Sequence, residues 1–179
     1  MDSSDIKKIL LDEQQICKIV KKLGEEISRD YEGKNLMIVG VLKGSVLFMA
    51  DLMRSITVDC KIDFMSVSSY NGGTKSSGAV KIIKDLDIDL AGYDLLIVED
   101  ILDSGNTLSY LKKLLLSRNP ASIKICTLLD KPDRRVADIK ADYVGAVIPD
   151  EFVIGYGLDY EEYYRNLPYV AVLSESVYE

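Results

Sequence analysis

The sequence predicts a single α/β domain in which helices cover a largely parallel sheet. Short apolar runs of strand length, the first at 36–41, alternate with segments of helical periodicity. These runs are apolar almost throughout, which is typical of strands that are buried on both faces. A chain of 179 residues is long enough for one sizeable core and short for two ordinary domains.

The first predicted element is an amphipathic helix over about 12–31. Its apolar residues recur at steps of four, three, four and four, which places them on one helix face: Ile16, Val20, Leu23, Ile27 and Tyr31. A buried strand at 36–41 follows. After a tight turn at Lys43-Gly44, a second helical pattern carries Phe48, Leu52 and Met53.

The remaining strands are predicted from apolar or alternating runs between turn residues, at 58–68, 80–83, 95–98, 123–129, 143–148 and 169–173. A Gly- and Ser-rich loop covers 69–78, and a third helix runs to about Ser117. Ligands of such sheets gather at the carboxyl ends of parallel strands. The loops after Val41, Val98, Leu129 and Ile148 are therefore the expected site.

Composition excludes several classes of function. The chain has no histidine, so Ser-His-Asp and Cys-His nucleophiles and imidazole metal sites are excluded, and acid–base chemistry falls to carboxylates, lysines or tyrosines. A net charge of −7 and a pI near 4.7 disfavour nucleic acid as a partner. Cys17, Cys60 and Cys126 lack disulfide or zinc spacing and are expected to be reduced core thiols.

Neither a membrane nor an export route is expected. No apolar stretch approaches the roughly 20 residues that a membrane helix needs. The first residues are acidic and lack the basic-then-apolar order of a signal peptide. The expected location is the cytoplasm.

The strongest motif begins where the apolar strand 95–98 meets two acids, Glu99 and Asp100. A third acid, Asp103, opens a small-residue turn that leads into a helix. Such a turn offers backbone N–H groups and hydroxyls to a phosphate, with the helix dipole favouring the anion. Carboxylates beside an anion site suit ribose hydroxyls or Mg²⁺ instead. Taken alone, however, Asp103 and Ser104 could simply cap a helix.

This segment resembles the diphosphate-sugar motif of the phosphoribosyltransferases: an apolar strand, two acids, two variable residues, then Asp/Thr-Ser/Thr-Gly-x-Thr. The resemblance implies a type I phosphoribosyltransferase fold, with a core over about 36–148 and a small hood built from N-terminal and C-terminal segments. It implies that Glu99 and Asp100 bind the ribose hydroxyls and Mg²⁺, and that Asp103 handles a proton at purine N7. The implied phosphate loop contains Asp103, Ser104, Gly105, Asn106 and Thr107. Asn106 stands where the family usually has a basic residue, which leaves binding by the backbone intact.

Two further segments match the family. Val41-Leu42-Lys43-Gly44-Ser45 is a strand–turn–helix junction that could be an ordinary connection. By resemblance Lys43 and Gly44 belong to a pyrophosphate loop, which in the family contains a cis peptide, here Leu42-Lys43. Ser69-Tyr70 matches a Ser-Tyr pair in a mobile lid, so 69–78 is expected to close over phosphoribosyl pyrophosphate.

The segments 128–135 and 148–165 narrow the resemblance to the hypoxanthine-guanine branch. Lys131 can donate to a purine 6-oxo group, Phe152 can stack on the ring, and backbone groups near Val153 and Asp159 can bind the remaining edge. Adenine should be refused, because its 6-amino group meets a donor. The resemblance also assigns Asp159 to a second magnesium through water and Arg165 to pyrophosphate.

The implied reaction converts hypoxanthine or guanine to IMP or GMP and releases pyrophosphate, in a homodimer or homotetramer. Two alternatives remain at this point. One is a regulator that senses phosphoribosyl pyrophosphate and acts on nucleic acid, which should display a basic face. The other is an enzyme that prefers xanthine or another 6-oxopurine.

Overall fold

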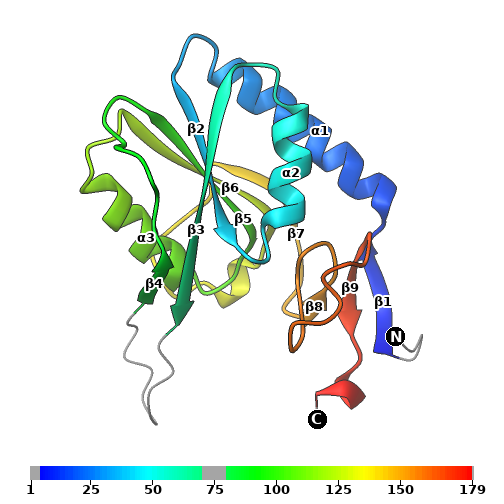
Figure 1. Ribbon diagram of the computed structural model, residues 1–179. Coiled ribbons are helices and arrows are strands. Elements are labelled where there is room, and N and C mark those ends of the chain that lie inside the picture. The colour runs from blue at the N-terminus through cyan, green and yellow to red at the C-terminus, as the bar shows by residue number, and fades with distance from the viewer. Residues whose placement is uncertain (1–4, 70–79, 179) are drawn as a thin grey trace.

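A six-stranded sheet forms the centre of the protein (Figure 1). The structure, a computed structural model, describes residues 5–69 and 80–178. The strands follow the order β4 (Val80–Lys84), β3 (Cys60–Ser69), β2 (Leu36–Leu42), β5 (Asp94–Leu102), β6 (Ser122–Asp130) and β7 (Tyr143–Val147). Only β4 runs antiparallel to its neighbour among these strands. The carboxyl ends of the other five therefore lie at one edge.

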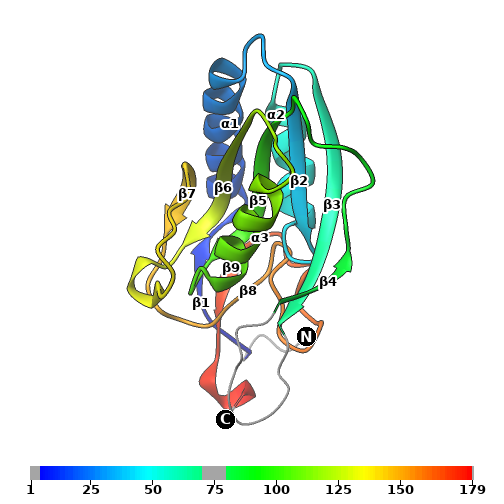
Figure 2. The ribbon, with the colours of Figure 1, turned by 90° about the vertical axis from the view of Figure 1, so that its left-hand side faces the viewer.

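Helices cover both faces of this sheet (Figures 1 and 2). α1 (Glu13–Asp30) and α2 (Val46–Ser55) lie on one face, and α3 (Asn106–Leu116) lies on the other. Alternate residues of β2 point to opposite faces, so Ile38 packs in the core beneath α1 and α2, whereas Val39 packs beneath α3. The central strands are buried on both faces, as their continuous apolar runs predict.

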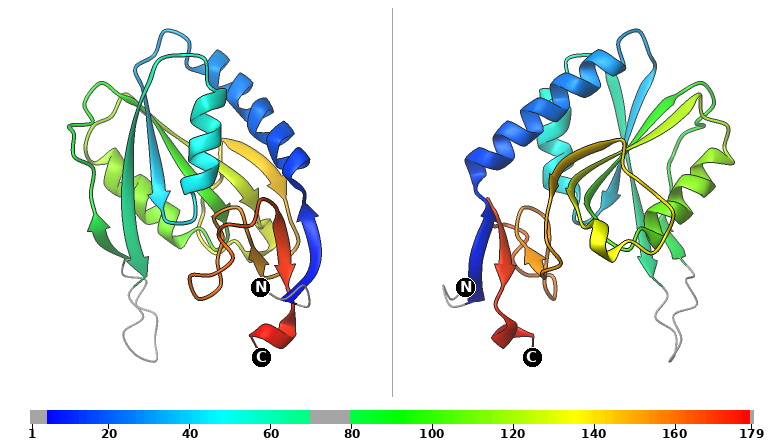
Figure 3. Two further views of the ribbon diagram at one scale, coloured as in Figure 1. Left: turned by 45° about the vertical axis from the view of Figure 1, so that its right-hand side comes forward. Right: turned by 180° about the vertical axis from the view of Figure 1, so that it is seen from behind.

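A second, three-stranded sheet lies beside the carboxyl edge of the first; we call it the hood sheet. It consists of β1 (Ile6–Leu11), β9 (Val170–Leu173) and β8 (Val153–Ile154), paired in the order β1-β9-β8. Both pairings are antiparallel, and Ile6 is the partner of Leu173. Figure 3 shows β1 and β9 side by side, although they are far apart in the chain.

The predicted fold class is confirmed, with corrections to individual elements. β1 and β8 were not predicted, because neither short segment has a pattern that identifies it without its partner β9. β5 was predicted to end at Val98 but continues to Leu102, with Glu99 and Ile101 paired to β6. The prediction of three core thiols was wrong for Cys17, which is exposed, whereas Cys126 is buried. Among the described residues, no helix is long and apolar enough to span a membrane.

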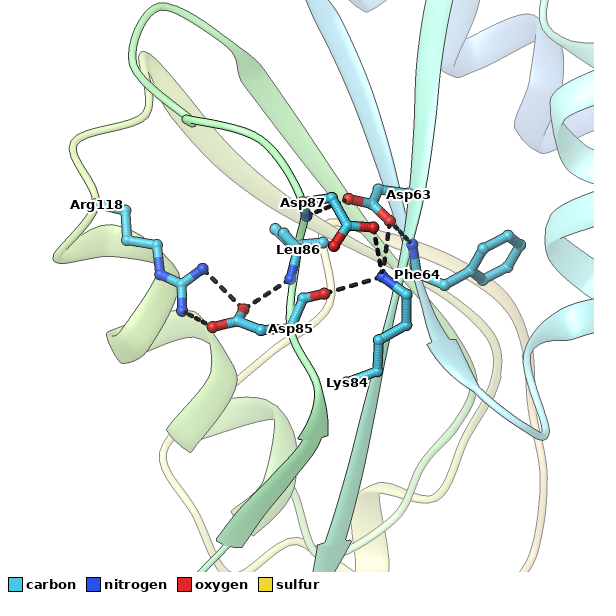
Figure 4. A network of polar contacts seen from close by, with 7 residues as sticks. All are labelled: Asp63, Phe64, Lys84, Asp85, Leu86, Asp87 and Arg118. Atoms are coloured by element: carbon cyan, nitrogen blue, oxygen red, sulfur yellow. Dashed lines mark hydrogen bonds and ion pairs between the residues drawn. The ribbon is translucent and has the colours of Figure 1, made fainter.

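A polar network fastens the outer strands of the central sheet to the loop before β5 (Figure 4). Asp63 on β3 accepts hydrogen bonds from Lys84 at 3.3 Å and from the backbone N–H of Asp87 at 3.0 Å. Arg118, just after α3, donates to both carboxylate oxygens of Asp85 at 2.8 and 2.6 Å. These contacts fix β3 and β4, which flank residues 70–79.

Candidate functional site

Two acids, Glu99 and Asp100, lie near the carboxyl end of β5, the strand at the centre of the site. Glu99 is buried, and its burial, reinforced by the charge of Asp100, raises its pKa well above the ordinary value. Burial raises the pKa of Asp100 to about 6, against the opposing hydrogen bond from the Ile101 N–H and the charge of Arg165. No ion pair involves either carboxylate within residues 5–69 and 80–178. The pair is therefore suited to receive a cation or hydroxyl donors.

The turn after β5 is shaped to receive an anion. Gly105 has a φ of +81°, and a Cβ there would lie 2.6 Å from Ile139 Cγ2, so the close packing and the left-handed backbone both require glycine. α3 begins directly afterwards, and its first backbone N–H groups have no partners inside the helix. A cavity of about 250 Å³, which we call the phosphate cavity, opens in front of this turn and is bounded by Gly44, Glu99, Asp100, Ser104 and Thr107, among others.

The turn after β2 forms the opposite wall of the phosphate cavity. The Leu42–Lys43 peptide bond is cis, as the family resemblance implied. A Cβ on Gly44 would lie 1.7 Å from Oδ2 of Asp100. Gly157, with a φ of +100°, approaches from the other side, and a Cβ there would lie 1.9 Å from the Gly44 carbonyl oxygen. Gly44 is thus held between β5 and the segment that follows β8.

Two cations gather on a single glutamate beside this turn. Lys43 Nζ donates to Glu162 Oε2 at 2.9 Å, and Arg165 Nη2 lies 3.3 Å from the same oxygen. Arg165 also contacts Asp159 Oδ1 at 2.8 Å and donates to the Gly157 carbonyl at 2.7 Å. The hydrogen bonds from Lys43 and then Arg165 lower the pKa of Glu162. Glu162 therefore bridges the two cations.

A second, larger cavity lies between the central sheet and the hood sheet; we call it the base cavity. Its volume is about 490 Å³, and its walls include Lys131, Arg134, Phe152, Val153 and Tyr178. Ile101 and Asp103 line both the base cavity and the phosphate cavity. Asp103 therefore lies at the junction of the two.

The side chains of the base cavity combine a buried donor with an aromatic face. Lys131 is 5% exposed, and its Nζ donates to the Glu151 carbonyl at 2.6 Å. Phe152 is 43% exposed, which excludes an ordinary core role for its ring. Its ring meets Tyr160 edge-on at 5.8 Å and Tyr178 at 5.5 Å between centroids. A planar, partly apolar ligand with a hydrogen-bond acceptor fits these walls.

Asp103 has one carboxylate oxygen, Oδ1, that is buried and accepts no hydrogen bond among the described residues. The nearest cation is Arg134, whose Nε lies 3.3 Å away in an ion pair without hydrogen-bond geometry. The neighbouring Arg135 donates from Nε to the Asp103 backbone carbonyl at 2.9 Å. The Asp103 side chain as a whole is 41% exposed, so its carboxylate can meet a ligand at the junction.

The four loops that sequence analysis singled out all contribute to the two cavities. Asn106 heads α3 but is exposed and does not line the phosphate cavity. Asp159 contacts Arg165 instead of lining the base cavity. Ser69 ends β3, whereas Tyr70 and the rest of the predicted lid lie outside the described residues. The sequence alone indicates no role for Ile101, Arg135, Glu162 or Tyr178, because their contacts join segments far apart in the chain.

A domain family described as "Phosphoribosyl transferase domain" matches residues 7–161 of the chain. The match spans β5, the whole phosphate cavity and the base cavity except Val172, Glu175 and Tyr178. Fold and site together define the class of protein as a phosphoribosyltransferase.

Relatives at high identity narrow this class. The hypoxanthine-guanine phosphoribosyltransferase of Streptococcus pyogenes serotype M3 is 57% identical over 178 residues, 99% of each chain, and that of Staphylococcus aureus strain Mu50 is 56% identical over 98% of each. A crystal structure of a Staphylococcus aureus hypoxanthine phosphoribosyltransferase superposes with a TM-score of 0.95 at 56% identity, covering 98% of this chain and 95% of that one. The chain belongs to the hypoxanthine-guanine phosphoribosyltransferase family.

Proposed function

We propose that the protein transfers the phosphoribosyl group of phosphoribosyl pyrophosphate to hypoxanthine or guanine, giving IMP or GMP and pyrophosphate in purine salvage. The observation that carries this proposal is the junction at Asp103. A cavity with a stacking ring and a buried donor meets a cavity with an anion-binding turn, and one carboxylate lines both. A purine in the first and a ribose 5-phosphate in the second would meet at this residue.

The base cavity supports the choice of a 6-oxopurine. Lys131 can only donate, so its ammonium pairs with a 6-oxo oxygen and opposes a 6-amino group. Phe152 offers its exposed ring for stacking. The remaining base edge would meet the backbone of Val153, which lines the base cavity, and that of Asp159, which directly follows the lining residue Leu158. Discrimination against adenine follows, because mismatch leaves buried polar groups unpaired.

The phosphate cavity supports the sugar assignment. The turn from Asp103 to Thr107 would hold the 5′-phosphate on the N–H groups at the start of α3. Glu99 and Asp100 would accept from the ribose hydroxyls. Gly44, with the amide-rich turn after β2, would receive the pyrophosphate, whose charge Lys43 and Arg165 would neutralise; Ser69 and Tyr70 would close over it.

The donor set also fits Mg²⁺. The buried Glu99 and the adjacent, partly buried Asp100 both have raised pKa values. Within residues 5–69 and 80–178, no three His, Cys, Asp or Glu residues form a cage of their own. Magnesium commonly binds through one or two carboxylates and completes its shell with water and substrate phosphates. Glu99 and Asp100 would hold the ion against the sugar diphosphate, and Asp159 a second one through water. The bound metal would neutralise charge on the departing pyrophosphate.

In this reaction the protein would align the base with the sugar and accept one proton. Base N9 attacks C1′ while the bond to pyrophosphate breaks, with inversion at C1′. The Asp103 carboxylate, whose side chain is 41% exposed at the junction, would take the proton from N7 as the base gains its new bond. The two cavities, which share Ile101 and Asp103, would hold the base and the sugar next to each other, and this alignment would lower the barrier to their reaction.

Initial rates with each base test this function. Formation of IMP and GMP should require both phosphoribosyl pyrophosphate and magnesium, and adenine should react far more slowly. A rate with xanthine above both would indicate a different 6-oxopurine preference. Tight binding of phosphoribosyl pyrophosphate without turnover of any base would refute an enzymatic role. We further propose that the protein is cytoplasmic and forms a homodimer or homotetramer. Sedimentation analysis of the purified protein would check the oligomeric state.

A further inference from the structure

Arg135 is a partly buried cation near the site, and no step of the proposed chemistry uses it. Its side chain is 15% exposed. Nε donates to the Asp103 carbonyl at 2.9 Å, Nη2 to the Leu102 carbonyl at 3.1 Å and Nη1 to the Ile139 carbonyl at 2.9 Å. Nη2 also pairs with the carboxylate of Asp130. One guanidinium thus joins the end of β5, the end of β6 and the loop before β7.

The carbonyl groups on either side of Asp103 accept hydrogen bonds from other donors, so loss of Arg135 should mainly affect Asp103 itself. The Leu102 carbonyl also accepts from the Lys131 N–H at 3.0 Å. The Ser104 carbonyl accepts from the N–H groups of Val136 and Ala137 at 2.9 and 3.0 Å. For the Asp103 carbonyl, by contrast, Arg135 is the one donor found in the described part of the chain. The backbone of the residue that lines both cavities therefore depends on this side chain.

A lysine would not replace the guanidinium. Arginine presents its donors in a planar fork, and here Nε, Nη1 and Nη2 are each committed to a different partner. The side chain of Arg135 also packs closely against Gly105, because a Cβ on Gly105 would lie 3.0 Å from Arg135 Cδ. The stem of the arginine therefore packs directly under the anion-binding turn.

We propose that Arg135 is a positioning residue for the transfer reaction: it sets the orientation of Asp103 at the junction of the two cavities. This inference rests on the proposed function of Asp103. Arg135 acts through the Asp103 backbone and lines neither cavity. Its loss should therefore slow the chemical step while the 5′-phosphate turn, held by Val136 and Ala137, still binds the sugar diphosphate.

The first test compares kcat with KM in Arg135→Lys. A carboxylate displaced by about an ångström can lower the rate roughly 10²-fold, so kcat should fall by about 10- to 100-fold while KM for phosphoribosyl pyrophosphate changes less than about threefold. Arg118→Gln is the matched control. Arg118 also donates to both oxygens of an aspartate (Figure 4), but it follows the C-terminal end of α3, whereas Asp103 precedes the N-terminal end of that helix. The control should lower the melting temperature with kcat and KM unchanged. A fall in stability with unchanged kinetics in Arg135→Lys would overturn the proposal.

A second variant covers the case in which Arg135→Lys does not fold. Removal of the guanidinium alone leaves Asp130 as a buried unpaired charge, so Arg135→Gln is combined with Asp130→Asn. The same loss of kcat at nearly constant KM supports the proposal, and wild-type kcat overturns it.

The third test asks whether Arg135 acts through Asp103. In the Asp103→Asn background, Arg135→Lys should cause no further loss of kcat, because residues that act as one unit are not additive. If Arg135→Lys lowered kcat by the same factor in the Asp103→Asn background as in wild type, the proposal would be overturned. If Asp103→Asn itself kept full turnover, the proposed role of Asp103 would fail instead, so the two failures are distinguishable.

Discussion

Gly44 and Asp100 approach so closely that the turn after β2 has no room for a side chain. A Cβ on Gly44 would lie 1.7 Å from Oδ2 of Asp100. The carboxylate at the end of β5 and the turn after β2 are thus fitted to each other as two walls of one cavity. Any side chain at residue 44 must push the carboxylate away from its place.

Gly44→Ala should therefore lower kcat/KM by roughly 10²-fold or more, because the displaced carboxylate is assigned to the sugar and its metal. Steady-state kinetics with phosphoribosyl pyrophosphate as the varied substrate measure this loss. Gly92→Ala is the control: its φ of +78° is strained for alanine, but no atom lies within 4 Å of the new Cβ. It should cost about 1 kcal/mol of stability without a kinetic effect. Wild-type kinetics in Gly44→Ala would contradict the close fit.

Asp103→Asn should cut turnover by roughly 10²- to 10⁴-fold, the usual range for loss of a general acid–base group. The amide cannot accept the N7 proton, although its shape preserves the cavity wall. Binding of phosphoribosyl pyrophosphate, measured by calorimetry, should remain within a few-fold of wild type. Asp133→Asn, on an exposed turn nearby, should leave turnover unchanged. Near-normal turnover in Asp103→Asn would remove Asp103 from the mechanism.

Lys131→Gln should narrow the preference for hypoxanthine over adenine by roughly tenfold or more, because the amide can donate or accept. The measurement is the ratio of kcat/KM for the two bases in wild type and variant. Lys140→Gln, at an exposed position, serves as the control. An unchanged ratio would shift base specificity to backbone groups near Val153 and Asp159.

Glu162→Gln should strengthen inhibition by pyrophosphate about two- to fivefold. The carboxylate holds Lys43 and Arg165 in the free protein and must give way to an incoming anion. The expected gain is small because exposed ion pairs contribute about 0.2–1 kcal/mol each. It should shrink as ionic strength rises. Glu161→Gln is the neighbouring control, and weaker inhibition in Glu162→Gln would show that this carboxylate orders the cations productively.

The free energy of unfolding should fall at acid pH, in part because Asp63 becomes protonated. Burial alone would raise the pKa of Asp63, but hydrogen bonds from the Asp87 and Phe64 N–H groups and from Lys84 lower it below 3.8. A lowered pKa in the folded state means that the contribution is complete above pH 3.8 and is lost as pH falls through the lower value. Urea unfolding at neutral pH and at about pH 3 should show less acid destabilisation in Asp63→Asn than in wild type. Asp59→Asn, at an exposed position, should retain the wild-type slope.

The sequence predicted those parts of the fold that are determined by patterns within a short segment of the chain. Continuous apolar runs located β2 and β5, and the acids and small residues after Val98 located the anion-binding turn. The exact end of β5 was missed because Glu99 and Asp100 look like loop residues until their pairing partner β6 is known. Burial and backbone pairing there override the low strand preference of acids.

Contacts between distant segments could not be predicted in the same way. Lys43 and Glu162 are separated by 119 residues, and neither sequence neighbourhood indicates the other. The role of Arg135 was hidden because an arginine in a charged turn usually faces solvent. Its burial becomes visible only when the ends of β5 and β6 are in place.

The hood sheet has a consequence for how the protein acquires its activity during synthesis. β1 pairs with β9 across a separation of 167 residues between Ile6 and Leu173, whereas neighbouring strands of the central sheet are joined by much shorter connections. Closing so long a loop carries the larger entropic cost and comes late in folding. On the ribosome, the segment of β1 must wait until β9 has been translated. The base cavity, lined by both Lys7 and Val172, is completed only then, so a nascent chain with its central sheet already formed would carry Lys131 but still lack the wall that the hood sheet supplies.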